Sequence, residues 1–404
     1  MKNKMLLVLV VLALVASTAV FGACKGAPAA PVEKEPLKIG GLFSLTGFAV
    51  AFGGESYRAV IVALEEADYQ VAGRPIEFIA EDIASDPAVA MDKVRKLVET
   101  DKVDVVFGPI FTDACSAVFP YVTKMGVPTM QVTAQPGVIK VPAKWVWQTT
   151  GDGPQQTYPM GLYAYEDLGY RTAITIGTDF LPSWKYIEGF TRGFTDSGGR
   201  ILQQQWCPFG TTDFTPYIIN FPDADVLVTW MGENLIPAFL QFKELGVWEK
   251  MPIIGASDAS ITNPDILPEL GDAVDGYVTE AHYVRTFDTP WNKEFVEAYQ
   301  ERWGMLPGNY AGCTYATMQV LFEGLRISGG DASPEVLAEA LDSVSMDTVR
   351  GPVSFNEVRI GQGSAFIVRI DTVEGVNIPT VVAEYTTTSK MVGDELEIRA
   401  TRKW

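Results

Sequence analysis

The stretch KIGGLFSLTG, residues 38–47, decides how the rest of the chain is interpreted. Its apolar run up to Leu45 predicts a short buried strand that ends at Thr46-Gly47. Residues 49–69 follow directly and carry apolar side chains at helical spacing. A strand that is joined at once to such a helix is the opening of a β-α-β unit.

The alternation of strand and helix continues along the chain. The unbroken apolar character of residues 103–110 is typical of a parallel strand that is covered on both faces. Asp86 is a suitable N-cap for a helix at 87–100. Further strands are expected at 76–83, 128–134, 173–176, 201–206, 225–231 and 253–256, and further helices at 112–125, 183–196 and 235–245. We therefore predict an α/β protein with two doubly wound, Rossmann-like lobes.

The last third of the chain has a different pattern. Helical residues dominate from 290 to 345, and strand-like runs follow at 353–355, 365–370 and 380–385. A mostly helical stretch without its own sheet should pack on one of the two lobes, so the chain should cross between lobes more than once. Ligands of open α/β sheets bind beyond the carboxyl ends of the strands, which predicts a site in the cleft between the lobes.

The composition excludes several classes of function. The 404 residues contain 31 Lys+Arg against 50 Asp+Glu, a net charge of −19, which argues against a nucleic-acid partner. The single histidine, His282, would have to serve any His-dependent triad. The sequence holds no Walker loop, G-x-G-x-x-G, G-x-S-x-G or H-E-x-x-H motif. Carboxylate pairs leave glycosidase-like chemistry open without pointing to one pair. We expect a protein that is not an enzyme and carries no cofactor or metal.

The N-terminus predicts export. Lys2 and Lys4 precede an apolar run at 5–16, which is too short to span a bilayer and suits a signal peptide at 1–24. Phe21-Gly22-Ala23-Cys24 resembles a bacterial lipobox, in which the cysteine is lipidated, although leucine is usual where Phe21 stands. Simple secretion, with Cys24 discarded or free, is the alternative. Residues 25–36 read as an Ala/Pro-rich tether. The protein should be periplasmic or on the cell surface, anchored to the membrane at Cys24.

The ordered motifs resemble the type I periplasmic solute-binding proteins, in the branched-chain amino acid group of ABC-transporter receptors. The motifs are IGGLFSLTG (39–47), VFGP (106–109), GVP (126–128), QTTGD (148–152), DF (213–214), YAGCTYA (310–316) and GPVSF (351–355). The resemblance implies three crossovers between lobes, near Gly151-Asp152, Tyr283 and Gly361. Lobe I would then be 37–151 plus 283–360, lobe II 152–282 plus 361–395, and 396–404 a tail.

The resemblance also implies polar ligand contacts. Thr112 opens a helix whose N–H groups suit a carboxylate, and its position matches a hydroxyl residue that grips the ligand carboxylate in the family. Thr112 as a plain N-cap is the alternative. The family binds the ligand amine through the carbonyl at Thr133 and the residue at Gln135, where Thr or Ser is usual; Gln135 as a surface turn residue stays open. Asp258 is the candidate counter-ion for the amine, although the family register falls on Ser257, and an N-cap role for Asp258 is the alternative.

Aromatic side chains should form the wall of the pocket. Phe52 and Tyr310 match wall positions that are aromatic in the family, and Phe48, Phe111, Trp184 and Trp230 lie on segments that should reach the cleft. Core packing is the alternative for each of them. Family tyrosines are replaced by Pro182 and Gly232, which predicts a pocket of different shape. Cys115, Cys207 and Cys313 are read as small buried apolar residues.

The function implied is a monomeric extracytoplasmic receptor that binds an amino acid, branched-chain or otherwise apolar or aromatic, and delivers it to an ABC permease. The cleft would close on the ligand by hinge motion. One alternative keeps the fold and binds an aromatic carboxylate or a urea- or amide-type compound. Another is a sensory ligand-binding protein.

Overall fold

The structure is a computed structural model that describes residues 35–133, 144–392 and 395–404. The expected export signal with Cys24, most of the expected tether, and Gln135 lie outside the described residues. The helices and strands described below all belong to residues 36–404.

The first sheet has the strand order β2-β3-β1-β4-β5-β6 and is parallel except for the antiparallel pair β2–β3. The order reverses beside β1, which is where doubly wound sheets bind ligands. Its strands are β1 (Leu37–Phe43), β2 (Gln70–Val71), β3 (Arg74–Asp82), β4 (Val105–Phe107), β5 (Thr129–Gln131) and β6 (Val146–Gln148).

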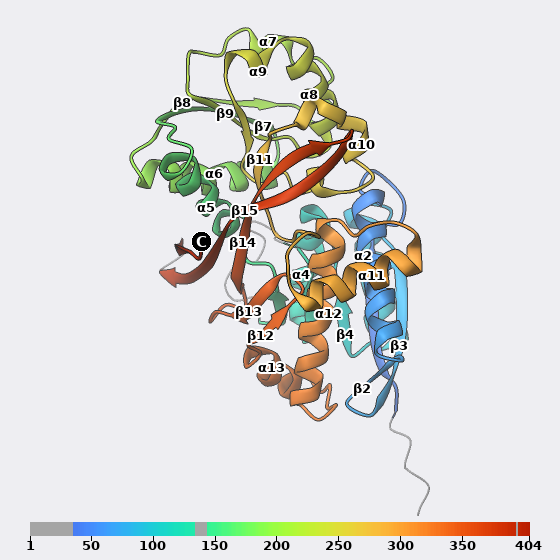
Figure 1. Cartoon of the computed structure of the whole chain (residues 1–404). Helices are drawn as coiled ribbons and strands as arrows, with labels where there is room; N and C mark the ends of the chain where they lie inside the picture. Colours follow the sequence, from blue (N-terminus) through green and yellow to red (C-terminus); the bar gives the residue numbers. More distant parts are fainter. Residues whose placement is uncertain (1–34, 134–143, 393–394) are drawn as a thin grey trace, which may run out of the picture. The chain divides into compact units, whose positions relative to one another are not determined.

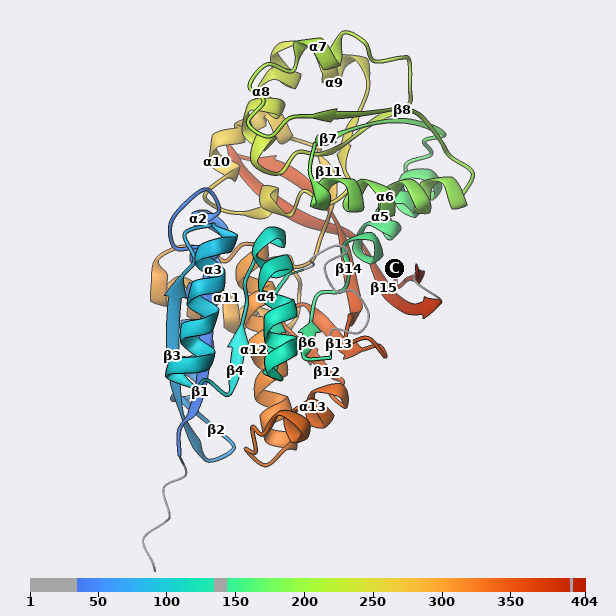
Figure 2. The same ribbon diagram turned by 180° about the vertical axis from the view of Figure 1, so that it is seen from behind.

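Helices cover both faces of the first sheet (Figures 1 and 2). α3 (Pro87–Arg95) and α4 (Thr112–Met125) pack on one face, and α2 (Val50–Glu66) and α12 (Asn309–Ile327) pack on the other. α11 (Pro290–Trp303) lies against α2, and α13 (Pro334–Asp342) lies against α12. The helical stretch expected at 290–345 therefore packs on this sheet. We call the first sheet with these six helices lobe I.

The second sheet combines parallel and antiparallel strands. Its order is β12-β13-β14-β11-β10-β9-β7-β8, and β15 pairs with both β14 and β16. The parallel strands are β7 (Thr172–Thr178), β8 (Arg200–Cys207), β9 (Val226–Trp230), β10 (Ile253–Gly255) and β11 (Val278–Ala281). The antiparallel strands are β12 (Met346–Thr348), β13 (Gly351–Phe355), β14 (Gly361–Val373), β15 (Val376–Val392) and β16 (Glu395–Arg402). Residues 396–404, expected as a tail, thus form most of an edge strand.

Helices also cover both faces of the parallel part of the second sheet. α5 (Gly153–Glu166) and α6 (Leu181–Asp196) pack on one face. The other face carries α7 (Thr215–Ile218), α8 (Leu235–Glu244), α9 (Val247–Lys250) and α10 (Leu267–Leu270). We call β7–β11 with these helices lobe II. The two doubly wound lobes predicted from the sequence are confirmed.

Buried Arg350 ties together the segments by which the chain passes between the lobes. Its Nε donates to the carbonyl of His282 at 3.1 Å, Nη1 to that of Thr149 at 3.3 Å and Nη2 to that of Ser364 at 3.0 Å. These carbonyls belong to the segments after β11, after β6 and within β14. Gly361 brings two of the segments close, because a Cβ there would meet the Thr149 carbonyl at 2.2 Å. One buried guanidinium therefore holds all three crossings.

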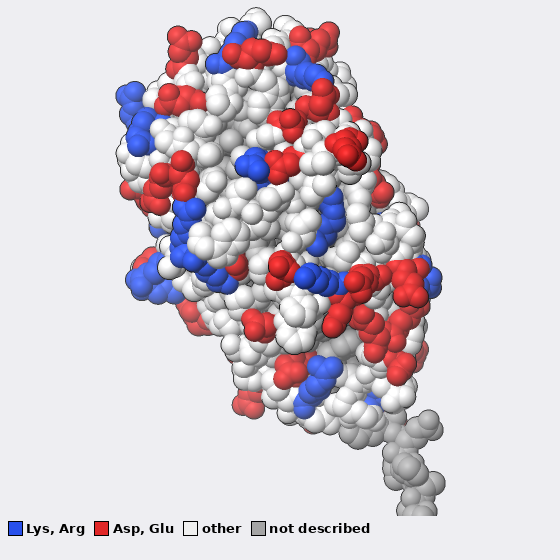
Figure 3. Space-filling model, in the orientation of Figure 1, with Lys and Arg blue, Asp and Glu red and all other residues white. Residues whose placement is uncertain are grey.

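The remaining structural expectations concern cysteines, membrane spans and charge. Cys115, Cys207 and Cys313 are buried and free, as expected. Among the described helices, none combines the length and apolarity that crossing a membrane requires. On the face shown in Figure 3, acidic side chains gather over α11, where Glu294 and Glu297 are exposed, and the described basic side chains are scattered.

Candidate ligand-binding site

A cavity of about 350 Å³ lies where the parallel strands of both lobes end. Its wall is formed by residues at or after the ends of β1, β4 and β5 and by the start of α12 in lobe I, and by residues at or after the ends of β7 to β11 in lobe II. This is the edge at which open α/β sheets bind ligands, and the volume falls in the range of small-molecule sites. The cavity is therefore the candidate site, and it is shared by the two lobes.

A run of six aromatic rings, which we call the aromatic belt, lines the cavity across both lobes. Successive ring centroids lie 5.3, 5.5, 6.2, 6.0 and 5.7 Å apart along Tyr186, Trp230, Phe180, Phe209, Phe48 and Phe111. The contact between Phe48 and Phe209 joins the lobes, and both rings are about half exposed. The belt gives the cavity an apolar wall suited to a flat or apolar ligand group.

A second aromatic pair contributes to the wall from lobe I. Phe52 and Tyr310, both predicted wall residues, stack with centroids 4.6 Å apart. Beside them, buried Glu55 accepts from the backbone N–H groups of Tyr310 at 3.1 Å and Ala311 at 3.2 Å, at the start of α12. Burial raises the pKa of Glu55 to about 7, and the hydrogen bond from Ala311 opposes that rise.

The N-terminus of α4 faces the cavity through Phe111 and Thr112. Phe111 is the N-cap residue, and no side-chain capping bond is present, so Thr112 is not the cap but the first helical residue. The start of a helix presents N–H groups that have no partner within the helix, together with the positive end of its dipole. This end of the belt is therefore suited to a carboxylate. Gly126, with φ of 73°, ends the helix.

Thr133, at the end of the segment after β5, also lines the cavity. Its carbonyl accepts from Gln131 Nε2 at 3.3 Å, and its Oγ1 donates to the Ile110 carbonyl at 3.3 Å. These bonds fix Thr133 beside the start of α4. Gln135 lies outside the described residues.

Asp258 lines the cavity, but its carboxylate is engaged by its own lobe. Oδ2 accepts from Thr229 at 3.0 Å and from the Tyr277 hydroxyl, and Oδ1 accepts from the Met231 N–H at 3.2 Å. Asp258 occupies the N-cap position of the short 3-10 helix that follows (Ala259–Thr262), as the alternative expected, but its side chain makes no capping bond there. Burial raises the pKa of Asp258 to about 6, and the Tyr277 hydrogen bond opposes that rise.

Ser257, the residue on which the family register falls, lies beside Asp258 in the wall. Its Oγ is buried and has no hydrogen-bond partner among the described residues. The same is true of Trp230 Nε1 in the aromatic belt. The lobe II wall therefore contains polar atoms whose bonding capacity the described chain does not use.

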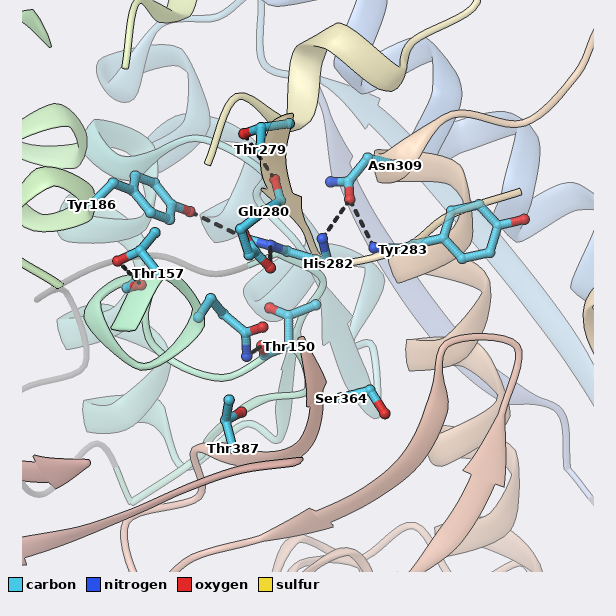
Figure 4. A network of polar contacts seen from close by, with 12 residues as sticks. Thr150, Thr157, Tyr186, Thr279, Glu280, His282, Tyr283, Asn309, Ser364 and Thr387 are labelled. Carbon is cyan, nitrogen blue, oxygen red and sulfur yellow. Dashed lines mark hydrogen bonds and ion pairs between the residues drawn. The ribbon is translucent and has the colours of Figure 1, made fainter. Parts of the chain in front are cut away.

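His282, which follows β11, brings a fixed imidazole to the cavity. Figure 4 shows Tyr186 pointing toward it and Asn309 bonded to its backbone. Its Nδ1 lies 3.1 Å from Glu280 Oε1, and its Nε2 lies 3.4 Å from the Tyr186 hydroxyl oxygen. His282 and Glu280 are both buried. From the sequence, His282 was considered only as a member of a His-dependent catalytic triad.

Trp184, which was expected at the wall of the pocket, does not line the cavity. It is 44% exposed, and its Nε1 donates to Asp179 Oδ1 at 3.0 Å. Two residues along a helix rotate the side chain by about 200°, so Tyr186 on the same helix faces inward instead. The sequence therefore pointed to the correct helix, α6, but Tyr186 rather than Trp184 reaches the cavity.

Several wall residues were not predicted from the sequence. They are Ala49, Ile110, Asp113, Phe180, Tyr186, Phe209, Ser260, His282 and Asn309. Phe180 lies two residues after the buried strand β7, a signal that could have found it, whereas Phe209 lies in a loop that gives no such signal. Pro182 and Gly232 do line the cavity, so these substitutions shape it. Among the described wall residues no Lys or Arg occurs, and the acids are Asp113 and Asp258.

The two lobes, the crossings and the shared cavity define a ligand-binding protein that holds its ligand between lobes. The comparisons agree with this class. Residues 36–375 match the family described as periplasmic binding protein, and the chain belongs to that family. The resemblance drawn from the sequence motifs is therefore confirmed, and its relatives are solute-binding proteins rather than enzymes.

Three individual proteins show how similar the chain is to known relatives. The Leu/Ile/Val-binding protein homolog 6 of Brucella suis is 26% identical over 331 residues, covering 79% of this chain and 83% of the relative. An ABC transporter substrate-binding protein from Sphaerobacter thermophilus is 30% identical with a TM-score of 0.82, covering 86% and 97% of the two chains. A solute-binding protein from Rhodopseudomonas palustris, solved with 3,4-dihydroxybenzoic acid, is 26% identical with a TM-score of 0.78, covering 87% and 97%.

Proposed function

We propose that the protein is the extracytoplasmic substrate-binding component of an ABC importer and that its cavity binds an amino acid with an aromatic or large apolar side chain. Asp258 carries this proposal. It is a buried acid in a wall whose described residues include no Lys or Arg. A pKa of about 6 leaves it largely ionised at neutral pH. The three groups that donate to Asp258 are neutral, so a ligand ammonium would supply the opposite charge that the described wall residues lack.

The remaining contacts follow from this arrangement. The start of α4 at Thr112 would hold the ligand carboxylate, and the Thr133 carbonyl with Gln135 would complete the ammonium site. The aromatic belt and the Phe52–Tyr310 pair would enclose the side chain. Closure of the lobes would remove water from these contacts and present the closed form to a permease. Lipid anchoring at Cys24, the tether at 25–36, the lobe boundaries given above and a monomeric state belong to the same proposal.

An aromatic carboxylate without an amine is the second candidate. The aromatic belt favours it, as does the 3,4-dihydroxybenzoic acid with which the Rhodopseudomonas palustris protein was solved. Against it stands the charge of the wall, because an anion near Asp258 would raise the pKa of that acid further. The two candidates thus differ in one group, the ammonium.

The test is a screen of amino acids and their des-amino analogues by melting temperature, with scattering to follow closure. A ligand bound only by the folded form adds about 2.7 kcal/mol of stability at a hundredfold excess over Kd. Asp258→Asn should weaken amino-acid binding about tenfold or more and leave a des-amino analogue nearly unchanged. Asp272→Asn, on the surface of lobe II, is the control. Equal loss for both ligands would contradict the role of Asp258, and a stabilising ligand without compaction would contradict closure.

A further inference from the structure

The proposed function assigns no ligand group to the end of the aromatic belt at Tyr186, where His282 lies. The belt begins at Phe111, next to the start of α4, and ends at Tyr186 beside His282. A carboxylate-bearing ligand held at the first end would direct its body along the rings. Whatever group reaches the other end meets an imidazole rather than a further apolar side chain.

His282 is held in place from several directions. Its backbone N–H donates to Asn309 Oδ1 at 3.1 Å, and its carbonyl accepts from Arg350 at 3.1 Å. Its ring Nδ1 is 3.1 Å from Glu280 Oε1, so the carboxylate fixes Nδ1–H as the donor to that side. Nε2 is then the nitrogen directed toward Tyr186 (Figure 4). Such a ring is arranged before any ligand arrives.

His282 Nε2 and Glu280 Oε2 both have bonding capacity that the described residues leave unused or use weakly. The distance from Nε2 to the Tyr186 hydroxyl oxygen is 3.4 Å, longer than a usual hydrogen bond. Glu280 Oε2 is buried and has no partner among the described residues. A neutral hydroxyl suits the cluster, because it can accept from or donate to Nε2 in either protonation state.

We propose that His282, positioned by Glu280 and accompanied by Tyr186, is a subsite for a phenolic hydroxyl on the ligand. The proposal rests on the proposed function and deepens it, since it makes the ligand a ring-hydroxylated aromatic acid. The stacked Tyr186–Trp230 pair, with centroids 5.3 Å apart, supplies the flat surface for the ring that carries the hydroxyl. An amino acid and an amine-free acid satisfy the subsite equally.

The test compares hydroxylated ligands with their matched analogues by isothermal titration. The pairs are tyrosine with phenylalanine and 4-hydroxybenzoate with benzoate. In the wild type we expect the hydroxylated member of at least one pair to bind about tenfold tighter or more, as a hydrogen bond lost from a buried site predicts. The pair that shows the preference identifies whether the hydroxyl comes from an amino acid or an amine-free acid.

Variants assign the preference to the subsite. His282→Phe should bring the ratio of the affinities for the hydroxylated and unhydroxylated ligands close to 1, because the hydroxyl loses its partner. Tyr186→Phe, which keeps the ring, should lower the ratio about threefold or more and decides the matter if His282→Phe does not fold. Tyr158→Phe, on α5 outside the cavity wall, is the matched control.

The outcomes separate the two proposals. Binding without preference in either pair, or a preference that both folded variants retain, overturns the hydroxyl subsite and leaves the proposed function standing. If none of the four ligands binds to the wild type, the hydroxyl subsite is overturned, and the screen of all amino acids by melting temperature decides separately whether the proposed function stands.

Discussion

The three crossings around Arg350 and the cavity both lie where the lobes meet, yet their chemistry differs. At the crossings, the guanidinium donates to three carbonyls of the chain itself. In the cavity, rings dominate the wall, and Ser257 Oγ and Trp230 Nε1 have no partner among the described residues. Bonds made within the chain stabilise the fold before a ligand arrives, whereas the wall of the cavity is used only when a ligand binds. We therefore expect the crossings to determine stability and the cavity to determine affinity.

The largest effect should follow from Arg350→Met. Three buried carbonyls would lose a charged donor, and Glu280 would lose a nearby positive charge. Removing one member of a buried charged cluster typically costs about 3–5 kcal/mol. Urea unfolding should show this loss in the free energy of unfolding.

Arg302→Met is the matched control for Arg350, because Arg302 forms an exposed ion pair in which its Nε donates to both carboxylate oxygens of Glu65. Exposed pairs contribute about 0–1 kcal/mol, so its variant should remain near the wild type. If the two variants lost equal amounts of unfolding free energy, the special role of Arg350 at the crossings would be contradicted.

Glu55 should give the protein a pH dependence that originates beside the cavity. Its folded pKa is about 7, against a model-peptide value of 4.5, so the folded state binds more protons than the unfolded state between these values. Stability from this group is then greatest below about pH 4.5 and falls as pH rises through 7, by on the order of 3 kcal/mol.

Glu55→Gln should reduce that fall, which melting curves at pH 5 and pH 8 would measure. Glu65→Gln, exposed on the same helix, is the control. If Glu55→Gln showed the same change in melting temperature between pH 5 and pH 8 as the wild type, Glu55 would not be the source of the pH dependence.

Thr112→Val should have the smallest effect and act on affinity alone. A hydrogen bond to a charged group contributes about 1.5–3 kcal/mol, so carboxylate binding should weaken about ten- to a hundredfold. The melting temperature without ligand should not change, because Phe111 and not Thr112 is the N-cap. Thr123→Val, at the far end of α4, is the control. A lower melting temperature with unchanged affinity would restore the capping role.

Predictability from the sequence differed between the two lobes. Phe52, Phe111, Thr112, Thr133 and Tyr310 were all placed at the cavity, because each lies at the end of a regular element with a clear pattern. In lobe II the outcome was mixed: Trp230 lines the cavity as expected, but Trp184 was chosen where Tyr186 faces inward. Asp258 was located, but its three bonds to its own lobe could not be foreseen, since Thr229, Met231 and Tyr277 come from other segments.

The sequence by itself determined the alternation of strands and helices, the two doubly wound lobes and the strand ends where a ligand would bind, because periodicity and local signals act over neighbouring residues. Only the tertiary structure decided which rings join into the belt, that one arginine links three crossings, and that His282 meets Tyr186 and Glu280. These contacts join segments far apart in the chain, and their geometry depends on how whole lobes pack rather than on any local pattern.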